Sequence, residues 1–292
     1  MKIDKFTLIH APDTLKSAVK QVREIKKAND LATKQTKAKS RVVKRGADSQ
    51  QSPRKFSTTP SVANKIVHPT AIGLWDLGAW LGSLYQIIEG LNRCQKAFLF
   101  FEVKAAVPLG LTKQPQRAIP KLEEFLESQL STDEKATVGN NFFAADYYAF
   151  GEDVRKDLRM DYLVGITPSM IADTRLHNGE REAAWNLFST SDASLILVSC
   201  YQLREFAEQT GQPFEAFLAT IIIAQVLAAK FYPTLTFHPD TGCLFDYNKN
   251  RSNIKNKVLS PAIESSCLTK IPPEYDSAIQ ALLKFILSIQ KE

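Results

Sequence analysis

The sequence predicts a mixed α/β fold, α+β in the grouping of its elements, in which helices pack on a mixed β-sheet. Apolar strand-like runs and amphipathic helical segments alternate along the chain, as is typical of helices layered on a sheet. Apolar runs at 184–188 and 194–199 flank the polar segment Ser-Thr-Ser-Asp, which predicts a β-hairpin and therefore antiparallel strands. Hydrophobic residues make up 44% of the chain, enough to build a core between such layers.

The chain divides into three predicted segments. Residues 1–30 contain a predicted strand at 5–10 and a helix that begins after Asp13, and we expect both to belong to the body. Residues 31–65 are rich in Ala, Thr, Lys, Ser and Gln, a composition that predicts a basic flexible linker or arm. We expect residues 66–292 to form a single mixed α/β globular domain.

Periodicity predicts the elements of that domain. Five apolar side chains recur at helical spacing over residues 70–91 and predict a helix there: Leu74, Leu77, Leu81, Leu84 and Ile88. Uninterrupted apolar runs predict strands at 97–103 and 161–167. Further helices are predicted at 119–130, 201–209, 214–230 and 275–289. Because the segment 214–230 is apolar on almost every face, we expect it to be a core helix.

The positive charge is concentrated in one part of the chain. The formal net charge is +6, but residues 15–55 hold thirteen Lys and Arg side chains against three acidic ones, a net charge of +10. Such an arm neutralises phosphates without reading their sequence, so we expect it to engage nucleic acid or an acidic protein partner. A solvated linker that only aids solubility is the alternative. The candidate contact residues are Lys34, Lys37, Lys39, Arg41, Lys44, Arg45, Arg54 and Lys55.

The cysteines and the hydropathy pattern indicate a cytoplasmic setting. The chain has four cysteines, and none of them form a CxxC pair or a disulfide framework. The longest uncharged stretch, 216–229, has 14 residues, fewer than the about 20 that a membrane span needs. The first residues lack the apolar run of a signal peptide. We therefore expect no contact with a membrane.

A compact turn after the apolar helix gathers His238, Asp240, Cys243 and Asp246. Together with Cys267, these residues offer nitrogen, oxygen and sulfur donors for a metal ion. The alternative is a structural turn in which the thiol is buried and the last carboxylate accepts backbone hydrogen bonds. We favour the structural turn, because no closely spaced His or Cys pair supports a zinc site, and we expect no cofactor.

This region resembles a zincin, and among zincins most closely an archaemetzincin. The resemblance covers roughly residues 160–250 and lies in the order of hairpin, short helix, long apolar helix and a turn containing His and Cys-Leu-Phe-Asp. Those enzymes carry HExxH on the long helix, a third His after it, and a Cys-rich turn. By position, His238 matches the third His and 243–246 the turn, whereas 221–225 reads Ile-Ile-Ile-Ala-Gln. The resemblance therefore implies a degenerate zincin without the catalytic motif.

These observations favour a protein without catalysis of its own. We expect a binding or scaffold component of a bacterial cytoplasmic complex, with the basic arm of residues 31–65 contacting the partner. One alternative is a metal-dependent or thiol-dependent hydrolase with a site around His238, Asp240 and Cys243. Another is a nucleic-acid-binding protein whose body also contacts phosphates. The sequence does not specify a substrate or an oligomeric state.

Overall fold

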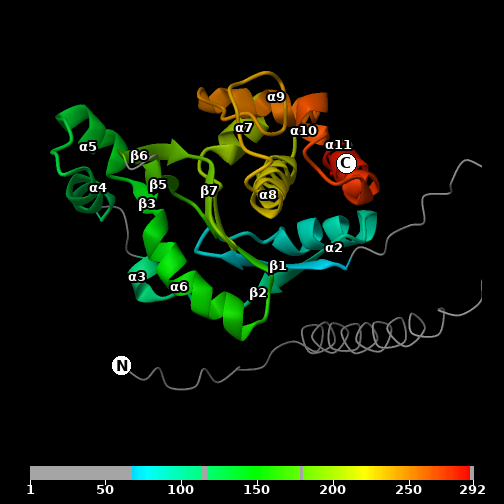
Figure 1. Cartoon of the computed structure of the whole chain (residues 1–292), viewed down its shortest axis with the longest axis horizontal. Coiled ribbons are helices and arrows are strands. Elements are labelled where there is room, and N and C mark those ends of the chain that lie inside the picture. Colours follow the sequence, from blue (N-terminus) through cyan, green and yellow to red (C-terminus); the bar gives the residue numbers. More distant parts are fainter. Residues whose placement is uncertain (1–67, 113–116, 178–179, 290–292) are drawn as a thin grey trace, which may run out of the picture. The chain divides into compact units, whose positions relative to one another are not determined.

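Five strands form the main sheet, in the order β2-β1-β4-β8-β7 (Figure 1). The computed structural model describes residues 68–112, 117–177 and 180–289. The first four strands of that order run parallel, and the edge strand β7 runs antiparallel to β8. In chain order they are β1 (Thr70–Asp76), β2 (Phe98–Val103), β4 (Tyr162–Thr167), β7 (Ser189–Asp192) and β8 (Leu195–Ser199). The predicted mixed α/β fold with a mixed sheet is confirmed.

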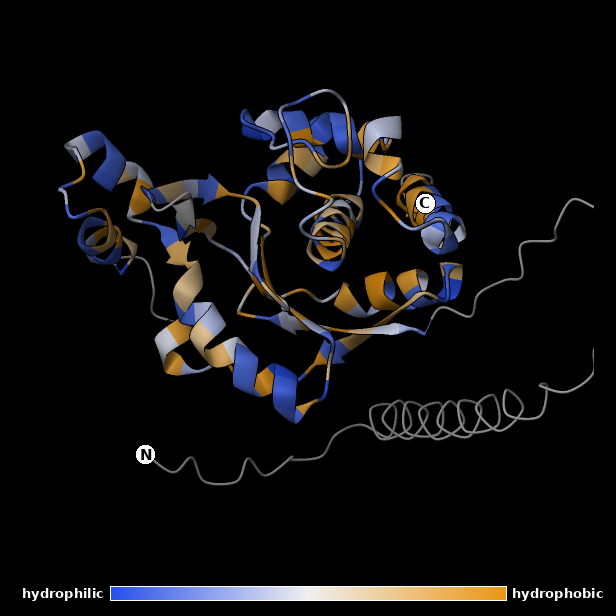
Figure 2. Ribbon diagram, in the orientation of Figure 1, coloured by the Kyte–Doolittle hydropathy of each residue, from blue (hydrophilic) through white to orange (hydrophobic). Residues whose placement is uncertain are grey.

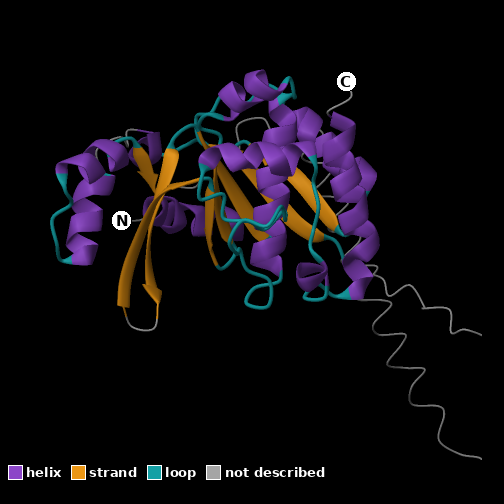
Figure 3. Ribbon diagram, turned by 90° about the horizontal axis from the view of Figure 1, so that it is seen from above, coloured by secondary structure: helices purple, strands orange, loops and turns teal. Residues whose placement is uncertain are grey.

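A second, three-stranded sheet has the order β3-β5-β6. Its strands are β3 (Asn141–Phe143), β5 (Met170–His177) and β6 (Glu180–Leu187). Strands β5 and β6 pair antiparallel and extend beside the main sheet as a long hairpin (Figure 3). The predicted hairpin between 184–188 and 194–199 is therefore wrong, because β6 pairs with β5, and the presumed turn 189–192 is itself a strand.

Helices cover both faces of the main sheet. On one face lie α2 (Leu84–Cys94), α7 (Leu203–Thr210), α8 (Phe214–Lys230) and α11 (Asp276–Ile289), whose buried side chains form one core with that face. On the other face lies α6 (Ala144–Asp157). The shorter helices are α3 (Leu109–Thr112), α4 (Ala118–Leu126), α5 (Thr132–Val138), η1 (Arg251–Asn253), α9 (Ile254–Leu259), α10 (Ser265–Leu268) and η2 (Pro273–Tyr275).

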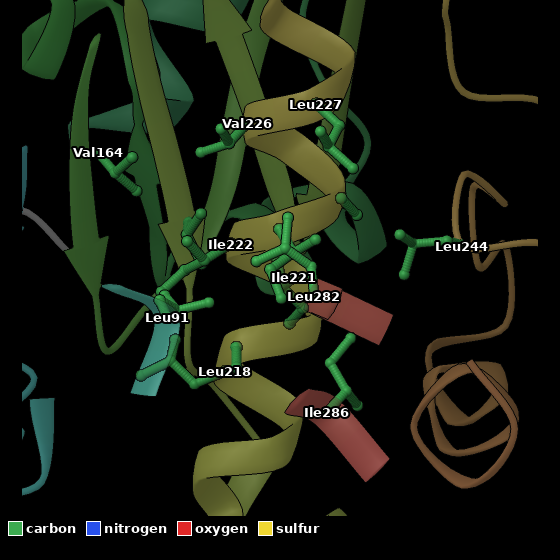
Figure 4. Close-up of a cluster of buried hydrophobic side chains, with 14 of the residues drawn as sticks. Leu91, Val164, Leu218, Ile221, Ile222, Val226, Leu227, Leu244, Leu282 and Ile286 are labelled. Carbon is green, nitrogen blue, oxygen red and sulfur yellow. The ribbon is translucent and has the colours of Figure 1, made fainter. Parts of the chain in front are cut away.

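Helix α8 is the core helix that its composition predicts. Fourteen of its seventeen residues are buried, and most of the helix is coloured as hydrophobic (Figure 2). Ile222 is fully buried and lies beside Leu91 of α2, while Leu282 and Ile286 of α11 approach the same helix (Figure 4). A helix that is apolar all round can be accommodated only where neighbours enclose it in this way.

The helix predicted over 70–91 is wrong in its first half. Residues 70–76 form β1, an inner strand between β2 and β4, and only residues 84–94 are helical. A strand that is buried on both faces has apolar side chains at every position, so helical spacing can occur in it by chance. The chain leaves β1 through Asp76, whose carboxylate accepts the backbone N–H groups of Gly78, Ala79 and Leu81 at 2.6–2.9 Å.

The predicted N-terminal strand and helix and the basic arm of residues 31–65 lie outside the described residues. Among the residues that the structure does describe, no helix is both long enough and apolar enough to span a membrane.

Candidate metal centre and adjoining groove

Three potential metal ligands converge beyond the end of α8. The donor atoms of His238, Cys243 and Cys267 all lie within 4.8 Å of one another. His238 and Cys243 belong to the loop after α8, and Cys267 lies on α10. Asp240, which the sequence placed with this cluster, instead accepts Asn248 N–H at 2.8 Å and the side-chain amide of Asn253 at 2.6 Å. The structure thus brings His238, Cys243 and Cys267 together and turns Asp240 to other partners.

The loop between the first two ligands is a closed turn. The His238 backbone N–H donates to Phe245 O at 3.0 Å, and Tyr247 N–H donates to His238 O at 2.8 Å. Gly242, with φ of +97°, adopts a left-handed conformation that favours glycine. Its N–H donates to the Asp246 carboxylate at 2.8 Å, so Asp246 accepts a backbone hydrogen bond as predicted. This network closes the loop through hydrogen bonds of its own.

The hydrogen bonds of His238 define its tautomer. Its Nδ1 lies 2.9 Å from Pro239 O and 3.4 Å from Asp246 Oδ1, which are both acceptors. A proton on Nδ1 satisfies this arrangement and leaves a lone pair on Nε2. Nε2 lies 3.3 Å from Cys267 Sγ. The ring therefore presents its metal-binding nitrogen to the thiol, and a carboxylate supports its far side, as is common for histidine ligands.

Both thiols are buried and close to each other. Cys243 and Cys267 have no exposed surface. Burial raises the pKa of Cys267, and negative charge on Cys243 would raise it further. The backbone N–H of Glu264 points to Cys243 Sγ at 3.5 Å. A bound cation would favour the thiolate forms of both cysteines.

Helix α8 contributes no ligand to this cluster. Gln225, at the end of the Ile-Ile-Ile-Ala-Gln segment, is 4% exposed. Its Oε1 accepts the Ser189 hydroxyl at 2.7 Å, and its Nε2 donates to Ser191 Oγ at 2.9 Å. Gln225 therefore ties the core helix to the edge strand β7. Helix α8, all of whose residues are described, carries no histidine, and residues 221–225 include no acidic side chain that could act as a catalytic base.

A large groove runs beside β7. It has a volume of about 1880 Å³ and is lined by β7, by side chains between residues 220 and 230 of α8, by the β5–β6 hairpin and by the loop of residues 246–251. Arg251 secures one wall, because its guanidinium donates to Asn186 O at 2.7 Å and to Tyr201 O at 3.2 Å and covers the Phe188 ring at 3.9 Å. Burial lowers the pKa of Arg251 to about 10, so it remains charged at neutral pH.

Lys257 links the candidate metal loop to the groove. Its Nζ is buried and donates to Leu244 O at 3.0 Å and to Asp246 O at 2.6 Å. Burial lowers the pKa of Lys257 to about 8, although nearby acidic groups oppose this shift. The lysine thus joins α9 to the backbone on both sides of Phe245.

Several residues singled out in the sequence lie elsewhere. Cys200 follows β8 and is half-buried, and burial raises its pKa to about 11, which does not favour a nucleophilic thiolate. His177 ends β5. The eight basic side chains of the arm fall outside the described residues. Sequence reasoning missed the roles of Ser189, Ser191 and Gln225, because their hydrogen bonds join segments 34 and 36 residues apart.

Comparison with solved structures finds two similar peptidases, both of the kind that the sequence resembles. A zinc-dependent peptidase from Methanocorpusculum labreanum is 15% identical, with a TM-score of 0.39, over 68% of this chain and 98% of that one. Archaemetzincin from Archaeoglobus fulgidus, solved with malonate, is 11% identical, with a TM-score of 0.39, over 68% of this chain and 99% of that one. At these values the likeness carries no conclusion about activity. The sequence matches no protein-family profile and no curated protein.

Proposed function

We propose that the protein is a binding protein without a hydrolytic centre of its own, and that it holds a structural zinc ion between His238, Cys243 and Cys267. The observation that carries this proposal is the convergence of one imidazole nitrogen and two thiol sulfurs within 4.8 Å. Zinc bonds are about 2.3 Å to sulfur and about 2.0–2.1 Å to nitrogen, so neighbouring donors in a tetrahedral site lie about 3.3–3.8 Å apart. The 3.3 Å between His238 Nε2 and Cys267 Sγ fits this spacing.

Glu264 is our candidate for the fourth ligand, and its carboxylate, which lies outside the three donors that converge within 4.8 Å, would have to turn toward the ion. It precedes α10, directs its backbone N–H to Cys243 Sγ, and has a carboxylate whose pKa is lowered by hydrogen bonds from Thr241 and Ser266 and by the nearby His238. A set of one imidazole, two thiolates and one carboxylate suits zinc better than calcium or magnesium, which prefer oxygen ligands.

A structural role fits this site better than a hydrolytic one. Bound zinc would cross-link the loop of residues 238–246 to α10 through its coordination bonds. Hydrolysis by zinc needs an open coordination position and a general base, usually a glutamate. Two of the three ligands have no exposed surface, and α8 carries no histidine, while its one acidic residue, Glu215, lies in its first turn, at the far end from the cluster. The hydrolase alternative around His238, Asp240 and Cys243 also loses Asp240 to other partners.

Metal analysis of the full chain tests the proposal. Protein purified without added metal is expected to contain about one zinc per chain, and the cobalt form is expected to absorb as a thiolate complex. His238→Ala and Cys243→Ser are expected to lose the metal. Cys94→Ser is the matched control, because Cys94 is a half-buried thiol outside the cluster. Folded wild-type protein without zinc, even after incubation with zinc, would overturn the proposal, and so would cluster variants that retain a full complement.

A second candidate function rests on the basic arm. We propose that residues 31–65 contact phosphates of nucleic acid, because they hold nine Lys and Arg side chains against one acidic residue, Asp48. Binding of a random-sequence duplex should weaken steeply as salt increases, and it should fall when the eight basic residues are replaced by glutamine. If the glutamine variant binds as tightly as the wild type, the arm is a solvated linker.

A further inference from the structure

Two asparagine side chains in the groove have an oxygen atom without a hydrogen-bond partner. Asn186 Oδ1 and Asn248 Oδ1 are buried and unpaired among the described residues, and Asn248 is only 8% exposed. Both residues line the groove. Buried polar atoms are normally paired. The two oxygens therefore mark positions at which a ligand donates a hydrogen bond.

Hydrogen bonds already fix the backbone of these two residues. Asn186 N–H donates to Asn141 Oδ1 at 3.0 Å, and Asn186 O accepts the Arg251 guanidinium at 2.7 Å. Asn248 N–H donates to the Asp240 carboxylate at 2.8 Å. Because Arg251 lies in the same loop as Asn248, it joins the two walls of the groove that carry the unpaired oxygens. A site that is fixed in this way before the ligand arrives lowers the entropic cost of binding.

The charges near these oxygens disfavour an ionic ligand. A cationic amine would meet Lys249, Arg251 and Lys257, all of which line the groove. An anion would bring acceptor atoms against the two unpaired acceptors, which leaves both sides without a donor. Arg251 and Lys257 already donate to backbone carbonyls, so an anion would have to compete for them. The ligand that matches this lining is therefore neutral and rich in hydrogen-bond donors.

Two exposed tyrosines line the same groove. Tyr232 is 73% exposed and Tyr247 is 62% exposed. Tyr247 directly precedes Asn248, and its N–H donates to His238 O at 2.8 Å, so the closed turn after α8 holds its backbone. An aromatic ring offers a flat apolar face within an otherwise polar lining. A pyranose ring complements such a face, because its C–H groups form an apolar side and its hydroxyls lie around the rim.

The size of the groove and the kind of donor it requires indicate an oligosaccharide. The volume of about 1880 Å³ exceeds the roughly 300–1,000 Å³ typical of small-molecule sites, so more than one sugar unit fits. A hydroxyl can rotate its proton toward whichever acceptor lies near it, whereas a peptide N–H is fixed in the plane of its amide. Unpaired acceptors on two different walls therefore suit hydroxyl groups better than peptide N–H groups.

We propose that the groove binds a neutral oligosaccharide. Sugar hydroxyls donate to Asn186 Oδ1 and Asn248 Oδ1, and sugar rings pack against Tyr232 and Tyr247. This sugar site rests on the proposed binding function, for which it names the ligand class, and it uses none of the zinc ligands. Zinc content is measured for every sample. Absence of zinc then counts against the metal site alone, and absence of sugar binding to zinc-loaded protein counts against the sugar site alone.

Isothermal titration calorimetry on the full chain tests the sugar site. The probes are neutral hexasaccharides of different linkage and composition: maltohexaose, cellohexaose, mannohexaose, xylohexaose and N-acetylchitohexaose. At least one of them is expected to bind with a Kd below about 1 mM. The corresponding monosaccharide should bind at least about tenfold more weakly, because it occupies a small part of the groove. A mixed octapeptide library, titrated in the same way, represents the competing class of ligand.

Variants of the lining residues place the sugar in the groove. Tyr247→Ala and Asn248→Gly are each expected to raise the Kd about tenfold. Glycine is compatible with the φ of 51° at Asn248, so this variant is expected to fold. Tyr85→Ala is the matched control and should leave the Kd unchanged, because Tyr85 is 63% exposed but lies on α2, outside the lining of the groove.

Thermal unfolding checks that each variant is folded, and if Asn248→Gly is not, the exposed Tyr247 decides. Three results would overturn the sugar site. They are a folded wild type that binds no hexasaccharide, octapeptides that bind more tightly than every hexasaccharide, and equal affinity of Tyr247→Ala and Tyr85→Ala for the best sugar.

Discussion

Replacing Gln225 with methionine tests whether this side chain clamps the edge strand to the core. Methionine has nearly the same length and volume, so the packing around α8 is kept while both polar contacts are lost. The lost bonds are Ser189 Oγ to Gln225 Oε1 at 2.7 Å and Gln225 Nε2 to Ser191 Oγ at 2.9 Å. A neutral hydrogen bond contributes about 0.5–1.5 kcal/mol net, so the pair is worth about 1–3 kcal/mol. The two serines are half-buried and line the groove, so water can replace the amide there.

A double-mutant cycle isolates this contribution. The free energy of unfolding is measured by urea denaturation for wild type, Gln225→Met, the pair Ser189→Ala with Ser191→Ala, and the triple variant, at equal metal content. The coupling energy is expected to be about 1–3 kcal/mol. The control is Gln209→Met, which removes two exposed 3.2 Å bonds, one to Glu205 and one from Lys255, and should cost less than about 0.5 kcal/mol. A coupling energy within about 0.3 kcal/mol of zero would refute the clamp.

Three further measurements concern the core and two buried charges. Ile222→Ala should lower the free energy of unfolding by about 2–5 kcal/mol. Leu287 is 38% exposed, so Leu287→Ala should cost less than about 1 kcal/mol. Equal losses would contradict the packing described. Burial raises the pKa of Asp173, so folding favours its protonated form. The wild type should therefore lose stability relative to Asp173→Asn as pH rises from about 4 through that raised pKa. A stability difference that does not depend on pH would contradict this. Burial lowers the pKa of Lys257 from 10.5 to about 8, so the unfolded chain binds more protons than the folded chain between these two pH values. As pH rises through that window, the free energy of unfolding of the wild type should increase by up to about 3 kcal/mol relative to Lys257→Met. No increase would mean that the lysine is solvated.

The elements that sequence predicts well are those whose pattern admits one interpretation. The apolar segment 214–230 is longer than a typical strand, so its pattern predicts a buried helix, and α8 spans the same residues. The runs at 97–103 and 161–167 are short and uninterrupted, and they became β2 and β4. In each case local composition and the tertiary environment demand the same structure.

The edge strand shows where such reasoning fails. Ser189-Thr-Ser-Asp192 has the composition of a turn and no apolar residue. Its strand conformation comes from the ladder with β8 and from side-chain bonds to α8 and β5 on its two faces. Those partners lie far away in sequence, so a local pattern cannot reveal them. Polar residues suit an edge that must remain soluble while its outer side is unpaired.

The sequence offered the donors of the candidate metal centre, but it could not show which of them converge. His238 and Cys243 lie in one turn, but Cys267 is 24 residues beyond Cys243 and follows no motif spacing. Its position depends on the packing of α10 against the loop, which also brings Glu264 N–H to the other thiol. Asp240 lies nearer in sequence yet binds Asn248 and Asn253 instead. Ligand identity at such a site is a tertiary property.

The two walls of the groove differ in what holds them, and this difference has a consequence. Strand β7 is anchored to α8 through Gln225. The opposite wall, at residues 246–251, continues from the loop that carries Cys243, and Lys257 grips that loop through the carbonyls of Leu244 and Asp246. Removal of zinc should therefore loosen the wall around Asn248 and leave β7 in place. Amide hydrogen exchange should therefore become faster after chelation at Tyr247 and Asn248, whose N–H groups donate to His238 O and to the Asp240 carboxylate, and should stay unchanged in β7; equal exchange with and without the chelator would contradict this link.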